Sequence, residues 1–197
     1  MNMKLVFLSA VVLFAPSLFA QQSALNKFNK ERESISKKGL TVLSSYAAAN
    51  IIYGSIAASK ATGSNKYFHE MNAIWNGITL GITGIGFLTA KKEGILSYNE
   101  SLKKQHNVEK LFLFNVGLDI AYIAGGAYLK ERSKTTAKNP LRLKGYGESV
   151  MLQGGVLLLF DGIMYAIHNR HGKNLQKMGE KLQLSVSGNS IGLVVKL

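Results

Sequence analysis

The 197-residue chain contains no cysteine, only two prolines and a single tryptophan. Without cysteine it can form no disulfide, no thiolate metal site and no catalytic thiol. No glycine-rich dinucleotide motif follows a predicted strand. The histidines, serines and carboxylates also show no Ser-His-Asp order and no paired-carboxylate signature. These absences leave no catalytic motif, so we expect a protein that is not an enzyme and has no cofactor.

Lysine and arginine are missing from four stretches, although they are abundant elsewhere and give the chain a net charge of +13. Each stretch has about 20 residues, the length a helix needs to cross the hydrocarbon layer of a bilayer. Only two acidic residues, Asp119 and Asp161, fall inside them. The pattern predicts four transmembrane helices, centred on residues 39–59, 71–90, 111–129 and 149–169.

The surplus of positive charge would suit either nucleic acid or anionic lipid headgroups. The lysines gather at the ends of the uncharged stretches, as in Lys37-Lys38 and Lys103-Lys104. No aromatic side chains are interleaved with them as on a base-stacking surface. We therefore expect membrane lipid with anionic headgroups as a partner and no nucleic acid. A homo-oligomer or a membrane-protein partner stays open.

Residues 1–20 have the pattern of a secretory signal peptide. Lys4 precedes an apolar core over residues 5–15, and the small residue Ala20 precedes two glutamines. Cleavage there would direct the chain to the bacterial inner membrane as a multi-pass protein with a periplasmic N-terminus. An uncleaved fifth helix is the alternative. The positive-inside rule opposes the signal-led orientation, because more lysine and arginine would then lie outside than inside.

The fold class that follows is all-α: a four-helix transmembrane bundle of two helical hairpins over residues 21–172. Predicted helices cover about 25–60, 66–92, 98–132 and 140–171. Gly63 is expected to end the first helix, with Ser64 or Asn65 capping the second, and Gly172 to end the fourth. Ser97 and Glu100 form a capping-box pattern, and Pro140 suits a first helical position. The tail, 173–197, is predicted to contain a short β-hairpin.

A weak internal repeat relates the two hairpins. Residues 70–85 align without a gap on residues 148–163, and Asn50-x-x-Tyr53 aligns on Asp119-x-x-Tyr122. Either the chain contains two copies of one hairpin, or glycine-rich apolar helices resemble each other by chance. If the repeat is real, Asn50 and Asp119 lie at equivalent depths.

Ionisable side chains inside a membrane span are costly, usually face the bundle interior and mark a candidate functional site. Helical spacing puts further polar residues on the faces of Asp119 and Asp161. Such a seam either binds an ion, a proton or a small polar ligand, or fixes helix packing through hydrogen bonds. The predicted intramembrane polar seam consists of Asn50, Asn76, Asn115, Asp119, Tyr122, Asp161, Tyr165 and His168, with Asn72 nearby.

Small residues and histidines have simpler interpretations. The glycines at positions 77, 81, 84, 125 and 126 are expected to let helices approach closely. His168 and His171 share a helix face, but no acidic residue or third histidine stands at ligand spacing. We therefore predict no metal site.

Two runs of the sequence carry a resemblance: residues 66–76, KYFHEMNAIWN, and residues 114–132, FNVGLDIAYIAGGAYLKER. With them the chain resembles a family of small uncharacterised bacterial multi-pass membrane proteins with a signal peptide, over nearly the whole mature chain. The resemblance implies the architecture, including a short C-terminal β segment, and transfers no activity and no functional residue. Our first hypothesis is a structural or partner-binding helical bundle. The alternative is a small transporter or ligand-binding membrane protein that uses the polar seam, and a membrane enzyme is a third hypothesis. A soluble four-helix bundle is the alternative to the membrane assignment.

Overall fold

The structure, a computed structural model, describes residues 3–90, 93–180, 184–187 and 190–193. Its four helices confirm the predicted all-α fold. The elements in chain order are α1 (Met3–Lys60), α2 (Gly63–Thr89), α3 (Tyr98–Arg132), α4 (Pro140–Glu180), β1 (Leu184–Ser187) and β2 (Ser190–Leu193). β1 and β2 are drawn as an antiparallel pair. The predicted C-terminal hairpin stays a prediction, because residues around and between these strands lie outside the described ones.

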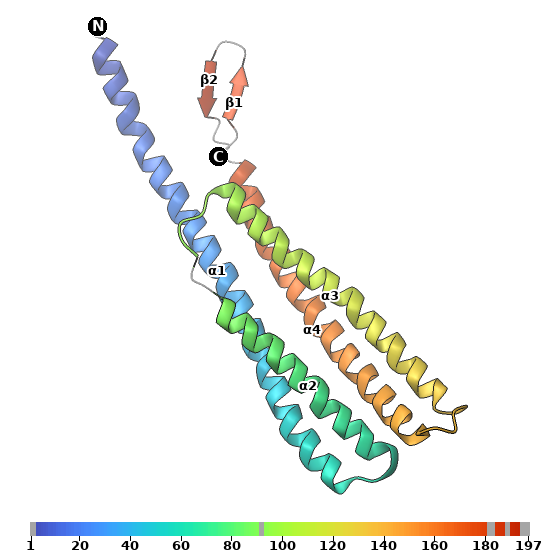
Figure 1. The fold of residues 1–197 in the computed structure, drawn as a ribbon. Helices are drawn as coiled ribbons and strands as arrows, with labels where there is room; N and C mark the ends of the chain where they lie inside the picture. Colours follow the sequence, from blue (N-terminus) through green and yellow to red (C-terminus); the bar gives the residue numbers. More distant parts are fainter. Residues whose placement is uncertain (1–2, 91–92, 181–183, 188–189, 194–197) are drawn as a thin grey trace.

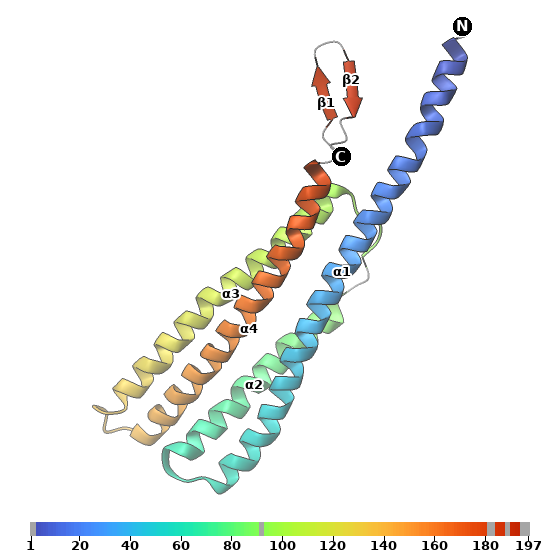
Figure 2. The ribbon, with the colours of Figure 1, turned by 180° about the vertical axis from the view of Figure 1, so that it is seen from behind.

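The helices form two antiparallel hairpins, α1–α2 and α3–α4, that lie side by side (Figure 1). The hairpins join chiefly through α2 and α4, which pack against each other. α1 also meets α3 and α4 near its residues 25–32. Seen from behind, the first residues of α1 extend beyond the other helices (Figure 2). α1 is continuous through the predicted cleavage position after Ala20.

Two helix starts were predicted correctly. The side chain of Ser97 accepts a hydrogen bond from the Glu100 backbone N–H, and the Glu100 carboxylate accepts one from the Ser97 backbone, so the capping box is present. α4 begins at Pro140 as expected. The predicted cap of α2 was wrong: Thr62 is the N-cap residue, and Gly63, with φ of 60°, already opens the helix. Glycine suits this position because it adopts positive φ without steric strain.

The predicted end of α4 was also wrong, because the helix continues past Gly172 to Glu180. Gly172 is buried against α3: a Cβ there would lie 2.5 Å from Glu109 Oε1 and 3.2 Å from Gln105 Cγ. The glycine therefore allows two helices to pack instead of terminating one. Leu175, in the following turn, is fully buried. Burying a leucine stabilises the extension by roughly 1.5–3 kcal/mol.

The glycine prediction was correct only for Gly126. A Cβ on Gly126 would lie 2.6 Å from the carbonyl oxygen of Gly147, so α3 and α4 cross here with their backbones in contact. Gly145 and Gly154 on α4 make similar close approaches, to α2 and α3. A Cβ would meet nothing within 4 Å at the other predicted positions, Gly77, Gly81, Gly84 and Gly125. Sequence spacing identified small residues but not the helix face that is packed.

The three helices α1, α3 and α4 extend beyond α2 at one end to form a region that we call the head, residues 22–38, 98–110 and 168–180. Its centre is apolar. Leu25, Phe28 and Leu175 are buried together, with Tyr98, Leu102 and Met178 packed against them. Polar side chains, including Asn29, Arg32 and Gln105, are buried around this apolar cluster. No described head residue is an exposed large apolar side chain, as expected of a surface that lies in water.

The remaining helical residues, 39–60, 63–89, 111–132 and 140–167, form what we call the body. Here large apolar side chains lie on the outer surface. Its buried residues include Asn72, Asn76, Thr79, Thr83, Asp119, Ser149, Gln153 and Asp161, whereas Ile52, Ile82, Leu159 and Ile163 are among many exposed large apolar side chains. The body therefore has a largely polar interior and an apolar exterior.

Three helices are long and apolar enough to cross a membrane, over the ranges Gln22–Lys60, Tyr98–Arg132 and Pro140–Glu180. We expected all four helices to be long and apolar enough to cross a membrane, but α2 is not among the three that are. α2 carries Asn72 and Asn76 on its buried face, together with threonines and glycines that add little apolar surface. In this bundle α2 lies against both α1 and α4.

Candidate functional site

A pocket of about 370 Å³ lies between α2 and α3, with α4 behind it. Its polar lining consists of Thr79, Asn115, Asp119, Tyr122 and Asp161. Its apolar lining consists of Leu43, Trp75, Ile78, Ile82, Leu118 and Leu157. The volume lies within the range of small-molecule sites in proteins, about 300–1,000 Å³. Four of the predicted seam residues therefore line one pocket.

The two carboxyl groups of the pocket are both buried, with Asp119 2% and Asp161 5% exposed. Both line the pocket together with the Asn115 side chain. Asp119 Oδ2 has no hydrogen-bond partner among the described residues. A buried acceptor in this state is costly, by roughly 1–3 kcal/mol, unless a ligand or water satisfies it.

A glycine explains why these two carboxyl groups line the same pocket. Gly154 lies seven residues before Asp161 on the inner face of α4. A Cβ on Gly154 would lie 3.0 Å from the carbonyl oxygen of Asp119 and 2.9 Å from the Ile123 side chain. The glycine allows α3 to lie directly on α4 at this level, and Asp119 on α3 and Asp161 on α4 then line the same pocket.

An aromatic pair connects the two sides of the pocket. The rings of Trp75 on α2 and Tyr122 on α3 pack edge to face, with their centroids 4.8 Å apart. Among the described residues the backbones of α2 and α3 make no close approach. The opening between these helices is bordered by Ile78, Ile82 and Leu118, which are all exposed on the outer surface of the body. The pocket therefore opens sideways between α2 and α3.

Two other predicted seam residues, Asn50 and Asn76, lie in a neighbouring amide cluster that joins α1, α2 and α4. Asn72 Nδ2 donates to Asn50 Oδ1 at 3.2 Å, and Asn76 Nδ2 donates to the Asn72 carbonyl at 2.8 Å. Gln153 Nε2 donates to Asn72 Oδ1, and the Tyr46 hydroxyl donates to Gln153 Oε1 at 3.1 Å. These hydrogen bonds fit the packing interpretation of the seam.

The last two seam residues lie apart from the pocket. His168 is fully buried where the head meets the body, with Nε2 3.4 Å from Ser36 Oγ and its ring stacked on Phe112. Tyr165 is half-buried and does not line the pocket. His171 Nε2 lies 3.1 Å from the Phe28 carbonyl oxygen. The structure thus divides the predicted seam into a pocket, an amide cluster and separate residues near the head.

Sequence analysis missed four residues that complete these sites: Tyr46, Trp75, Thr79 and Gln153. For two of them the sequence carried a signal, namely helical spacing from a predicted seam residue. Tyr46 lies one helical turn before Asn50, and Gln153 lies eight residues, or about two turns, before Asp161. Trp75 and Thr79 carried none, because the facing helix that makes them pocket residues is far away in the sequence.

Metal-binding potential is limited in the part of the chain that was searched. The described residues contain no group of three or more His, Cys, Asp or Glu side chains that could hold a metal ion. Asp119 and Asp161 therefore form a pair of carboxyl groups without a further strong ligand.

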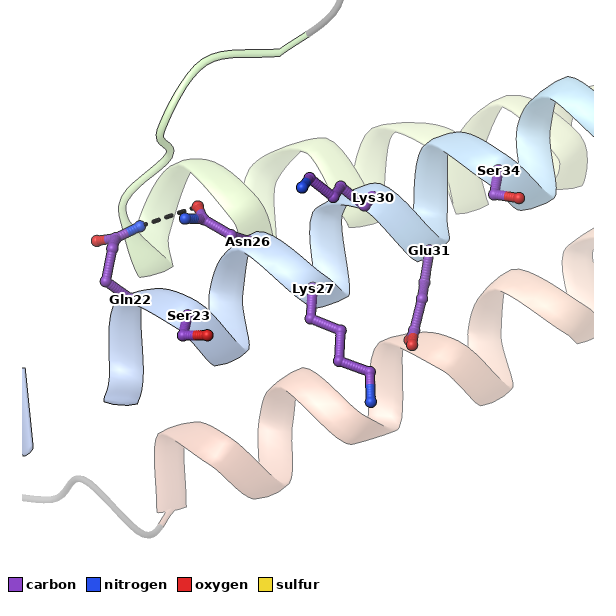
Figure 3. Close-up of a pocket in the computed structure, with 7 residues that line it drawn as sticks. All are labelled: Gln22, Ser23, Asn26, Lys27, Lys30, Glu31 and Ser34. Carbon is purple, nitrogen blue, oxygen red and sulfur yellow. Dashed lines mark hydrogen bonds between the residues drawn. The ribbon is translucent and has the colours of Figure 1, made fainter. Parts of the chain in front are cut away.

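A larger hollow of about 650 Å³ lies on the head (Figure 3). Its lining comes from a single helix, α1, and consists of Gln22, Ser23, Asn26, Lys27, Lys30, Glu31 and Ser34. The hydrogen bond drawn there joins Gln22 Nε2 to Asn26 Oδ1 at 3.2 Å. Lys27, Lys30 and Glu31 are exposed to solvent. This hollow is an open surface of one helix and gathers no buried polar groups.

The fold and the pocket define a class: all-α proteins of two packed helical hairpins, with long apolar helices around a polar interior. The chain belongs to a family of unknown function, DUF6992, which matches residues 42–162. The predicted resemblance to a family without a known activity is confirmed over this range, which is shorter than expected. The match includes every pocket residue, from Leu43 to Asp161, and excludes the head segments of α1 and α4. No curated protein and no solved structure matches the chain.

Proposed function

We propose that this chain is a multi-pass protein of the bacterial inner membrane whose body binds a small ligand in the pocket between α2, α3 and α4. The observation that carries the proposal is Asp119. This carboxyl group is almost completely buried, lines the pocket, and has one oxygen without a partner among the described residues.

The exterior of the body supports the membrane location. Ile52, Ile82 and Leu159 are 64%, 65% and 69% exposed, and many neighbours are similar. Leaving such a side chain in water instead of an apolar environment costs roughly 1.5–3 kcal/mol. Lipid removes this cost, and contiguous apolar surface of this extent otherwise promotes association.

The positions of the head and of the helix connections fit a single orientation of the whole bundle in the membrane. The head lies at one end, and the short connections α1–α2 and α3–α4 lie at the other (Figure 1). Cleavage of the proposed signal peptide after Ala20 would release the mature N-terminus at the head, which would then be periplasmic. The lysine and arginine distribution opposes this orientation, and a reporter fused after Glu180 would distinguish the two sides.

The structural hypothesis has one specific observation in its favour, the amide cluster. Its side chains hydrogen-bond to one another and connect three helices, although Asn76 Oδ1 has no partner among the described residues. The pocket differs because it encloses an open volume of about 370 Å³ lined by two buried carboxyl groups. A purely structural role therefore explains Asn50 and Asn76 better than it explains Asp119 and Asp161.

The single tryptophan, Trp75, lines the pocket and provides a direct test. The purified chain is reconstituted in lipid nanodiscs and titrated with three phenylbutyl compounds that carry an amine, an alcohol or a carboxylic acid. We expect a saturable change in Trp75 emission with at least one of them. Leu157→Phe, which fills the pocket, should abolish the change, whereas Leu159→Phe on the outer face should keep it. No saturable change in the wild type with any compound would contradict the proposal.

A further inference from the structure

The charge of the pocket is unbalanced. Asp119 and Asp161 are its only ionisable lining residues apart from the Tyr122 hydroxyl, and none of the lining residues is lysine, arginine or histidine. The nearest histidine along α4 is His168, seven residues beyond Asp161, which is about 10 Å along a helix. A buried carboxylate is stabilised chiefly by an opposite charge or by hydrogen-bond donors. The pocket therefore favours a cationic occupant and disfavours an anion.

The other lining atoms distinguish between kinds of cation. Calcium takes six to eight oxygen ligands. The pocket offers two carboxyl groups, the Asn115 amide and the Thr79 hydroxyl, and the remaining surface is mostly apolar. An ammonium group needs fewer partners, since it has at most three N–H donors. Asp119 and Asp161 both line the pocket and supply carboxyl oxygens to accept them.

The aromatic pair suits the same occupant. Trp75 and Tyr122 border the pocket on the two helices that flank the carboxyl groups. Aromatic ring faces attract cations within about 6 Å of the ring centre. The apolar side chains Ile78, Ile82 and Leu118 extend from there to the opening. A ligand with a positive end and an apolar body would match both surfaces.

From these observations we infer that the pocket binds an amphiphilic organic cation, with its protonated amine against Asp119 and Asp161 and its apolar part between α2 and α3. This inference rests on the proposed function. Because Ile78 and Ile82 are 58% and 65% exposed on the outer face of the body, the ligand enters sideways from the bilayer. The site thus selects a ligand by charge at its inner end and by lipid solubility at its opening.

Three matched probes test the charge of the ligand: 4-phenylbutylamine, 4-phenylbutan-1-ol and 4-phenylbutyric acid. They share one apolar body and differ in the charge of the end group at neutral pH. In the Trp75 titration the amine should bind at least about tenfold more tightly than the alcohol, and the acid should bind most weakly. A wild-type protein that binds the alcohol or the acid as tightly as the amine would overturn the inference and leave the proposed function standing.

Carboxyl-to-amide variants test whether Asp119 and Asp161 cause the preference for the amine. Asp119→Asn and Asp161→Asn keep the size of each side chain, and the double variant should lose the preference for the amine while still binding the alcohol. Glu131→Gln is the matched control, because Glu131 is exposed outside the pocket and pairs with Lys134. A double variant that keeps the full preference would overturn the inference. If the double variant does not fold, the wild-type comparison of the three probes decides alone.

Binding must also be separated from partition into lipid. A phenylbutyl compound that only dissolves in the bilayer gives an emission change that does not saturate and that persists in Leu157→Phe. That outcome with all three probes would overturn both the inference and the proposed function. A saturable response to the amine that Leu157→Phe removes would support both.

Discussion

The head and the body differ in the side chains that they expose, although the same helices run through both. Many large apolar side chains are exposed in the body, and none of the described head residues is of this kind. In the head, Leu25, Phe28 and Leu175 form an apolar centre. In the body, α4 buries Gln153 and Asp161 while Leu159 and Ile163 are exposed. Both regions bury polar side chains, but only the body exposes large apolar ones, and this change occurs within single continuous helices. It therefore reflects a change of surroundings along the helix axis, from water at the head to the proposed bilayer at the body.

The two regions also differ in how they treat buried charge. Arg32 in the head is 3% exposed and forms an ion pair with Glu93, while Arg32 Nη1 donates to Asn29 Oδ1 at 2.7 Å. Burial lowers the pKa of Arg32 below its ordinary value, and the negative charges of Glu93 and Glu33 oppose that shift. Among the described residues, Asp119 and Asp161 in the body have no such partner of opposite charge. The buried charge of Arg32 has a counter-charge within the protein and serves structure. Asp119 and Asp161 lack such a counter-charge among the described residues and are therefore the candidates for ligand binding.

The largest effect is expected when the buried ion pair between Arg32 and Glu93 in the head is removed. Glu93→Gln should lower the free energy of unfolding by about 3–5 kcal/mol, because it leaves Arg32 buried without its counter-charge. Glu131→Gln makes the same chemical change in an exposed pair and should cost less than about 1 kcal/mol. Thermal unfolding in detergent, followed by circular dichroism, measures both. Equal effects would show that Arg32 does not depend on Glu93.

A leucine pair compares the interior of the head with the exterior of the body. Leu175→Ala should destabilise the protein by about 3 kcal/mol, because Leu175 is fully buried and its removal leaves a cavity. Leu159→Ala removes the same atoms from an exposed position and should change the stability by less than about 0.5 kcal/mol. Denaturant unfolding monitored by circular dichroism provides the values. A large loss at Leu159 would mean that this face is covered by a partner or a second copy.

An isoleucine pair tests whether the body is surrounded by lipid. Ile82 on α2 and Ile95 beside the head are 65% and 76% exposed. Ile82→Asp should disfavour membrane insertion by about 2.5–3 kcal/mol, because it puts a charge in the hydrocarbon layer. Ile95→Asp should leave insertion unchanged, because that position faces water. The fraction of protein that resists alkaline extraction from membranes measures both, and equal fractions would contradict the membrane location of the body.

The smallest effect concerns the capping box at the start of α3. Hydrogen bonds from the Ser97 backbone N–H and hydroxyl lower the pKa of Glu100 below its ordinary 4.5. A lowered folded-state pKa gives stability that is present above pH 4.5 and is lost as the pH falls through the lower folded value. Glu100→Gln should therefore melt slightly below the wild type at pH 7, and the difference should shrink at pH 3. A difference that grows in acid would contradict this assignment.

The α2 and α4 helices show what pattern recognition achieved and where it stopped. In the predicted alignment of residues 70–85 on 148–163, Asn76 corresponds to Gly154 and Thr83 to Asp161, and all four are buried. Helical periodicity had predicted Asn76 and Asp161 on inner faces, and both are buried. It did not identify which glycines touch another backbone, because Gly77 and Gly81 have the same spacing as packed glycines but lie on the open face.

The sequence by itself determined the local features: four helices, the Ser97 cap, the start at Pro140, and the presence of Asp119 and Asp161 within apolar stretches. These depend on neighbours within a few residues, which backbone geometry and solvation fix directly. Only the tertiary structure decided that Asp119 and Asp161 share a pocket with Trp75, while Asn50 and His168 do not. That outcome depends on how closely α3 approaches α4 at Gly154, a contact between residues far apart in the chain that no local periodicity encodes.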